Sequence, residues 1–171
     1  MCDSVSKSLG GTMNRQIYTF GYEGLSLESF IQRLKSTKIE CVVDVRAVPL
    51  SRKKGFSKKS FSSALEAIGI RYIHLLPMGC PKETRDRYRE NGNWNAYTKA
   101  FMSYLSSQTE AVDELSKITA SKTCCLVCFE ADFDRCHRTF VAREVARLSG
   151  SSITHITSRN LIADPQVRIA A

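Results

Sequence analysis

The sequence predicts an α/β fold, organised as a single three-layer domain with a mostly parallel β-sheet and helices on both faces. Short apolar runs alternate with amphipathic segments along the chain, which is the pattern of consecutive βαβ units. The run Cys41-Val42-Val43 is apolar at every position, as expected of a strand that is covered on both sides. A chain of 171 residues with 43% hydrophobic residues is long enough to bury one sizeable core.

The first half of the chain begins with a predicted strand at 15–20, which ends at the turn 21–24. Ser26 is suited to cap a helix whose apolar residues recur at helical spacing through Leu34. A second strand is expected at 39–45, where the apolar run resumes and then ends in charged residues.

The middle of the chain continues the alternation. A helix is expected at 60–68, because apolar residues recur at helical spacing and Gly69 is a suitable residue after a helix end. A third strand follows at 70–76. Residues 82–95 are polar, mixed in charge and without a core pattern, so we expect a long loop of the kind that serves as a lid or binding loop.

In the second half, one long helix or two are expected over 94–118, followed by a strand at 123–130. A further helix is predicted to begin near Cys136, with Asp132 or Asp134 as its N-cap. A last strand at 152–157 completes the alternation.

The folded domain is therefore expected to span residues 15–157. Residues 1–14 are rich in Ser and Gly and are expected to be disordered, and Met13 is a second candidate start. Residues 158–171 show no core pattern and are expected to form a weakly ordered tail.

Charge and cysteine content limit the functional class. A net charge of +8 favours an anionic partner. The seven cysteines are odd in number and several lie in strand-like apolar runs, which indicates buried thiols in a reducing compartment rather than a disulfide scaffold. No apolar run approaches the roughly 20 residues that a membrane-spanning helix needs. We therefore expect a cytoplasmic protein without a membrane partner, and the sequence does not indicate its oligomeric state.

Polar residues follow the ends of four predicted strands. Because parallel strands bring their carboxyl ends to one edge of a sheet, and open α/β sheets bind ligands there, these residues are expected to converge. They are Tyr22, Glu23, Asp44, Arg46, His74, Glu130 and Asp132, and the helix that opens on Cys136 should lie beside them.

The acids at this edge are the leading candidates for chemistry. Glu130 could act as a general acid or base, with Asp44 or Asp132 as the second carboxylate, although the same acids could form an ion-pair network that fixes the edge. Cys136 could be a thiolate nucleophile with His137 as its base, but adjacent residues on a helix point about 100° apart. The substrate-binding candidates are Tyr22, Arg46, His74, Arg135 and Arg138.

The segment 51–59 is the most basic in the chain. Cations at this density can neutralise the phosphates of a polyanion, and they can equally form a solvated loop. The candidate phosphate-binding residues are Arg52, Lys53, Lys54, Lys58 and Lys59.

No metal or cofactor is assigned from the sequence. The sequence contains neither the Gly-x-Gly-x-x-Gly pattern nor the Walker A pattern of nucleotide-binding sites. Cys125-x-x-Cys128 resembles a ligand pair, but in a strand these side chains should face opposite ways. If a metal binds, the most suitable ligands are Cys136 and His137 with an acid, and the further candidates are Cys80, Cys128 and His74.

Several motifs occur in a characteristic order: Phe20-Gly21-Tyr22-Glu23-Gly24, Val43-Asp44-Val45-Arg46, Gly69-Ile70-Arg71-Tyr72-Ile73-His74-Leu75, and Cys128-Phe129-Glu130-Ala131-Asp132 with Cys136-His137-Arg138. Together they resemble the domain-of-unknown-function family 488 over about residues 16–157. The resemblance implies an α/β domain and no established activity. Gly21-Tyr22-Glu23 stands where many members carry Gly-His-Ser, so Tyr22 is assigned to the shape of the pocket. The Asp44-x-Arg46 strand end also resembles that of rhodaneses, but no Cys is followed by an Arg six residues on, as their anion loop requires.

The sequence thus predicts a hydrolytic enzyme for an anionic substrate such as a nucleic acid or nucleotide, acting on an N-glycosidic or phosphate-ester bond. One alternative is a nucleic-acid-binding module without catalysis that uses the basic segment. A second is a metal-dependent enzyme for a small molecule.

Overall fold

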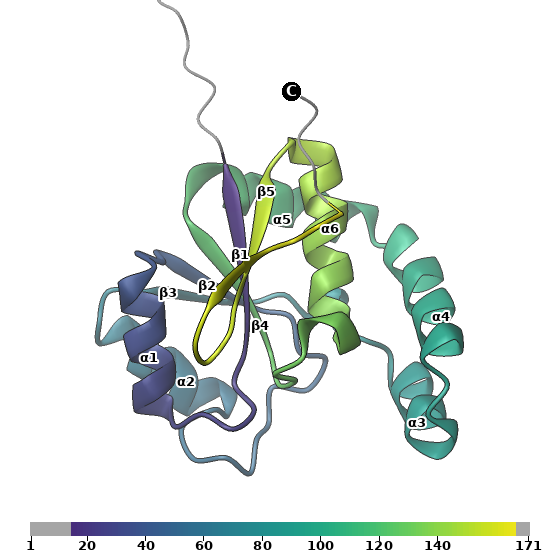
Figure 1. Cartoon of the computed structure of the whole chain (residues 1–171), viewed down its shortest axis with the longest axis horizontal. Coiled ribbons are helices and arrows are strands. Elements are labelled where there is room, and N and C mark those ends of the chain that lie inside the picture. Colours follow the sequence, from purple (N-terminus) through teal and green to yellow (C-terminus); the bar gives the residue numbers. More distant parts are fainter. Residues whose placement is uncertain (1–14, 167–171) are drawn as a thin grey trace, which may run out of the picture.

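A six-stranded sheet runs through residues 15–166, the part of the chain that the computed structural model describes (Figure 1). The strand order is β3-β2-β4-β1-β5-β6; the first five are parallel, and β6 pairs antiparallel with β5. This confirms the predicted α/β fold with a mostly parallel sheet. The expectations for 1–14 and 167–171 lie outside the described residues. The strands are β1 Gln16–Gly21, β2 Cys41–Asp44, β3 Arg71–His74, β4 Cys124–Cys128, β5 Ser152–Ile156 and β6 Leu161–Ala163.

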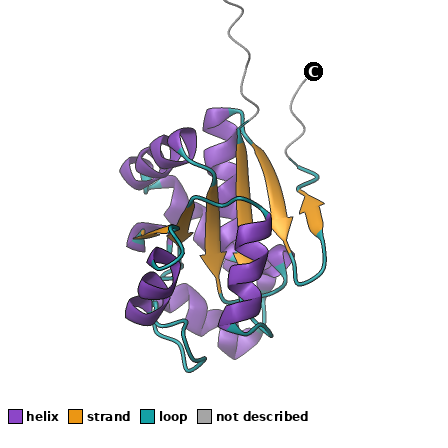
Figure 2. Cartoon of the chain, turned by 90° about the vertical axis from the view of Figure 1, so that its left-hand side faces the viewer, coloured by secondary structure: helices purple, strands orange, loops and turns teal. Residues whose placement is uncertain are grey.

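Helices cover both faces of the sheet, as Figures 1 and 2 show. Helices α1 and α2 lie on one face, and α4, α5 and α6 pack on the other. Among the described residues, no helix is long and apolar enough to cross a membrane. The helices are α1 Leu27–Ser36, α2 Lys58–Glu66, α3 Lys82–Asn91, α4 Trp94–Ser106, α5 Thr109–Ser121 and α6 His137–Ser149, with short 3₁₀ turns at Leu76–Met78 (η1) and Phe133–Arg135 (η2).

The sheet separates two hydrophobic cores, and this explains why its central strands are apolar throughout. In β4, Cys125 and Val127 face the α1/α2 core, whereas Leu126 and Cys128 face the α4/α5/α6 core. Successive side chains of a strand point to opposite faces, so every position of β4 is buried. Cys125 and Cys128 therefore lie on opposite faces, as expected from their spacing.

Residues 82–95, expected to be a long loop, contain helix α3 instead. The prediction was wrong because α3 buries no residue fully and so lacks a core periodicity. A Lys82–Asp86 ion pair one turn apart supports it, and Gly92 ends it in the left-handed conformation. The region 94–118 forms two helices, α4 and α5, with the break at Ser107 and Gln108.

The stretch expected to begin a weakly ordered tail at 158 contains β6. It is anchored by Asp164, which is buried and accepts hydrogen bonds at 3.0 Å from both Arg143 Nε and His155 Nε2. His155 is also buried, and its Nδ1 lies 2.8 Å from the hydroxyl of Thr19. A three-residue strand has too few positions to show an alternating pattern, so β6 could not be predicted from the sequence.

Acid is expected to destabilise the fold through His155. Burial lowers the pKa of His155, which faces Thr19, Phe133, Asp164 and the guanidinium groups of Arg138 and Arg143. As the pH falls, His155 therefore takes up a proton in the unfolded chain at a higher pH than in the folded chain. The free energy of unfolding should consequently fall as the pH drops below about 6.5. Asp164 acts in the same direction below about pH 3.9, because hydrogen bonds from Arg143 and its neighbours outweigh burial and lower its pKa.

The measurement is urea unfolding at neutral and mildly acidic pH, of the wild type and of His155→Gln. The variant should lose less stability on acidification, and this difference isolates His155 from the other histidines. An equal loss in both proteins would contradict the assignment.

Candidate functional site

The predicted polar residues do gather at the carboxyl edge of the sheet, but they form two groups on opposite faces. Glu130 packs with two cysteines that belong to the α4/α5/α6 core. Asp44 accepts a hydrogen bond from Tyr72, and its partner Arg46 donates one to Tyr22, on the α1/α2 side. The sheet therefore separates the two carboxylates that were expected to work as a pair.

The first group consists of Cys128, Glu130, Cys136 and His137, which we call the Cys/Glu/His cluster. Cys128 ends β4, Glu130 follows two residues later, and a turn through η2 brings the chain back to α6. Glu130 Oε2 lies 3.0 Å from Cys128 Sγ and 3.1 Å from Cys136 Sγ. One ligand atom from each residue can be chosen so that all four lie within 4.8 Å of one another.

His137 faces the two sulfurs because the chain at Cys136 is not helical. Cys136 is the extended N-cap of α6, with φ −137° and ψ 138°, so the divergence expected of neighbours on a helix does not apply. His137 Nδ1 lies 3.8 Å from Cys128 Sγ and 3.9 Å from Cys136 Sγ. The other ring nitrogen, Nε2, donates to the carbonyl of Val45 at 2.7 Å. A carbonyl only accepts, so this bond places the ring proton on Nε2 and leaves Nδ1 to the cluster.

Burial and mutual contacts shift the pKa values within the cluster. Burial, with the charge of Cys136, raises the pKa of Glu130. Burial by itself would raise the pKa of Cys136, but Cys128, Arg138 and His137 lower it well below its usual value. The hydrogen bond with Cys136 and burial raise the pKa of Cys128 far above its usual value. Burial raises the pKa of Cys80, a further predicted metal candidate, to about 11.

Arg138 is fully buried and supports the loop that carries Glu130. Its guanidinium donates to the carbonyls of Glu130 and Ala131. The end of β1 also approaches this loop closely, because a Cβ at Gly21 would lie 1.7 Å from the carbonyl oxygen of Glu130. Position 21 therefore has to be glycine, and the backbone at Glu130 is held from two directions.

The second group is a buried ion pair between Asp44 and Arg46. Asp44 is 0% exposed; Oδ1 accepts from Arg46 Nε at 2.8 Å, and Oδ2 accepts from the Tyr72 hydroxyl at 2.6 Å. Arg46 Nη1 donates to the Tyr22 hydroxyl and to the carbonyl of Phe56, each at 2.8 Å. The hydrogen-bonding groups of both side chains are thus met by protein partners on the α1/α2 side of the sheet.

The remaining predicted site residues lie around the cluster. Asp132 is exposed and caps η2, because its carboxylate accepts from the Asp134 N–H at 2.9 Å. Arg135 is exposed, with its guanidinium 5.5 Å from the centre of the Trp94 ring. His74 lies between the Arg46 carbonyl at 2.9 Å and Lys58 Nζ at 3.2 Å.

The basic segment adjoins the same edge through the contact of Lys58 with His74. Within residues 15–166, none of its five cations forms an ion pair. The segment is therefore available to an anion. Arg52, Lys54, Lys58 and Lys59 are exposed, and Lys53 is half-buried.

Cys128 is the residue that the sequence reasoning did not place in the catalytic group. The available signal was the spacing Cys128-x-Glu130 at a strand end, which puts both side chains on one face of the sheet. A second spacing, Cys125-x-x-Cys128, competes with this signal, but the sheet separates those two side chains.

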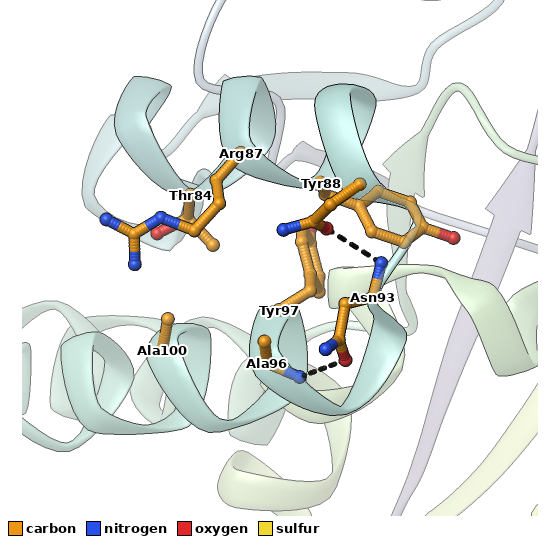
Figure 3. Close-up of a pocket in the computed structure, with 8 residues that line it drawn as sticks. Thr84, Arg87, Tyr88, Asn93, Ala96, Tyr97 and Ala100 are labelled. Atoms are coloured by element: carbon orange, nitrogen blue, oxygen red, sulfur yellow. Dashed lines mark hydrogen bonds between the residues drawn. The ribbon is translucent and has the colours of Figure 1, made fainter.

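A pocket lies between α3 and α4 (Figure 3). Thr84, Arg87 and Tyr88 line it from α3, and Ala96, Tyr97 and Ala100 line it from α4. Tyr97 is buried, and burial raises the pKa of its hydroxyl. None of the residues that line the pocket carries a thiol or a carboxylate.

Fold and site define an α/β protein with a Cys₂-Glu-His cluster at the carboxyl edge of a parallel sheet. The chain belongs to the family described as Domain of unknown function DUF488, which matches residues 26–145. No curated protein and no solved structure matched the chain. The match includes both groups at the edge and the basic segment.

Asp44→Asn is expected to act on stability. It leaves the Arg46 guanidinium buried without its counter-ion, which typically lowers the free energy of unfolding by about 3–5 kcal/mol. Tyr72→Phe is the milder comparison, because it removes one hydrogen bond to the same carboxylate and should cost about 1.5–3 kcal/mol. Chemical denaturation measures both variants. An Asp44→Asn protein as stable as the wild type would contradict a supporting role for this ion pair.

Proposed function

We propose that this protein is a hydrolase that acts on an anionic substrate, a nucleic acid or nucleotide, at the Cys/Glu/His cluster. The observation that carries the proposal is the convergence of Glu130, Cys136 and His137 at the carboxyl edge of the sheet. Open α/β sheets bind their ligands at this edge. A carboxylate, a thiol and an imidazole gathered there exceed what capping of α6 requires, since Cys136 makes no capping hydrogen bond.

Glu130 is the acid-base group in this proposal. Its carboxylate accepts a proton from water while the water oxygen bonds to the anomeric carbon of an N-glycoside or to the phosphorus of a phosphate ester. The bond to the leaving base or alcohol breaks with its electron pair, and the proton passes to that leaving group. Glu130 suits this role because it is the most exposed member of the cluster and its loop is held by Arg138 and by the approach of β1.

Solvent-exposed cationic side chains would bind the anionic groups of the substrate. Arg46 and Arg138, which the sequence suggested as substrate-binding residues, are buried and donate to protein groups. Arg135 is exposed at the end of η2, and four of the five cations of the basic segment are exposed, with Lys58 in contact with His74 at the end of β3. We therefore assign anion binding to these exposed cations.

Glu130→Gln should lower turnover by roughly 10²–10⁴-fold, the usual contribution of a general acid or base. The substrates are oligonucleotides with modified bases, in single- and double-stranded form, and nucleotides with phosphate-ester bonds. The variant should keep the far-ultraviolet circular dichroism spectrum of the folded protein. Glu90→Gln, an exposed change on α3, is the control and should leave turnover unchanged. Equal turnover of Glu130→Gln and wild type would remove Glu130 from the mechanism.

A second candidate is a nucleic-acid-binding module without catalysis, favoured by the exposed basic segment. Changing four lysines of that segment to Gln should weaken binding to single-stranded DNA and flatten its salt dependence by up to roughly 0.7 in log–log slope per lost contact. Fluorescence anisotropy at several salt concentrations measures this. The lysines are 53, 54, 58 and 59, and the control replaces Lys35, Lys38, Lys99 and Lys117.

These binding data separate the candidates. Binding that depends on the basic segment, without turnover of any substrate, supports the binding module and contradicts the hydrolase. A salt slope that responds equally to both sets of substitutions would show that overall charge, rather than this segment, attracts the nucleic acid.

A further inference from the structure

We infer that the Cys/Glu/His cluster is a zinc site, with Cys128, Glu130, Cys136 and His137 as its four ligands. Tetrahedral zinc, with bonds of about 2.0–2.3 Å, sets roughly 3.5–3.8 Å between most pairs of ligand atoms. Here Nδ1 lies 3.8 and 3.9 Å from the two sulfurs, and the carboxylate oxygen lies 3.0 and 3.1 Å from them. Four of the six pairs of ligand atoms thus lie within about half an ångström of the tetrahedral spacing, and the other two pairs lie within 4.8 Å.

The imidazole is already oriented as a metal ligand. Metal-binding histidines generally donate their second ring N–H to a carbonyl or carboxylate, which fixes the tautomer and the ring. His137 does so through Nε2 and the Val45 carbonyl at 2.7 Å. The edge of the Phe101 ring, with its centre 5.3 Å from that of the imidazole, confines the ring from the side. Nδ1 is thus aimed at both sulfurs before any ion enters.

The donor set selects the class of ion. Two thiolates and an imidazole suit zinc, whereas magnesium and calcium prefer sites built from oxygen. The cysteines and the histidine are at most 6% exposed, so the ion would be shielded from water on three sides.

The surrounding charge also fits a divalent cation. Two thiolates and one carboxylate bring three negative charges into a buried space, which is costly without compensation. A Zn²⁺ ion and the guanidinium of Arg138 bring three positive charges. Arg138 is 0% exposed and donates to the carbonyl of Glu130, so it is fixed beside the cluster as a permanent counter-ion.

Glu130 is the ligand best placed to exchange with water. It is half-buried, whereas the other three ligands are buried. Exchange would leave three protein ligands and one open position, the arrangement of catalytic zinc sites, in which the ion lowers the pKa of its bound water. Metal binding itself does not depend on the proposed hydrolysis; only this exchange step rests on the proposed function.

The test uses the full chain without a polyhistidine tag, produced with zinc in the medium and kept reduced. After dialysis, elemental analysis should find about one zinc per chain, and X-ray absorption should show two sulfur and two nitrogen or oxygen neighbours. Cobalt added to the metal-free chain should give the absorption bands of tetrahedral cobalt with sulfur ligands. Metal-free wild type that binds neither ion, or a site with four sulfurs or only oxygen, would overturn the inference.

Cys136→Ser and Cys125→Ser form the matched pair of variants. Cys136→Ser should weaken zinc binding by more than roughly 100-fold, beyond what loss of a supporting hydrogen bond costs. Cys125→Ser, a buried change in β4 on the other face of the sheet from the cluster, should retain zinc. Equal loss in both variants contradicts the ligand assignment. If Cys136→Ser does not fold, X-ray absorption of the wild type still decides, since it counts the ligands directly.

The two proposals can fail separately. Zinc bound as described, without hydrolysis of any anionic substrate, supports the zinc site and contradicts only the proposed function. Hydrolysis that persists at full rate after removal of the zinc contradicts the exchange step and supports a metal-independent hydrolase. A Cys128–Cys136 disulfide in protein kept reduced, found by mass spectrometry, would contradict the zinc site.

Discussion

The hydrogen bond from His137 to the carbonyl of Val45 is the contact on which the site depends. It joins the end of β2 to the first residue of α6, which are far apart in sequence, and it fixes which ring nitrogen faces the sulfurs. Without it, the imidazole could rotate, and neither an acid-base nor a metal-binding role would have a defined donor. The neighbouring Arg46 carbonyl is bonded by His74, so two consecutive carbonyls at this strand end hold imidazoles.

The sheet divides the polar edge into two halves, one with the Asp44–Arg46 ion pair and one with the Cys/Glu/His cluster. On the α1/α2 side, Asp44 and Arg46 satisfy each other and two tyrosines, in a core rich in stacked aromatic rings. On the α4/α5/α6 side, the cluster brings two thiols, a carboxylate and an imidazole together. The two groups differ in charge balance. In the salt bridge the two opposite charges neutralise each other, whereas two thiols and a carboxylate leave a negative charge that a cation can balance.

The sequence was informative where burial forces a pattern and uninformative where it does not. Continuous apolar runs located the central strands, because both faces of the sheet are covered. Helix α3 and strand β6 escaped detection, because one is almost wholly solvated and the other is held by the single carboxylate of Asp164. The expected pairing of Asp44 with Glu130 failed for another reason: an edge was predicted, but not the face on which each side chain lies.

By itself, the sequence determined the fold class, the parallel strands and the set of residues that reach the carboxyl edge. These follow from local periodicity and from the rule that parallel strands end together. Only the tertiary structure decided that Cys128 joins Glu130, Cys136 and His137, and that Asp44 and Arg138 are buried supports. The reason is that side-chain grouping depends on the register between β2 and β4 and on the extended conformation of Cys136. Neither the register nor this backbone conformation produces a periodic pattern in the sequence.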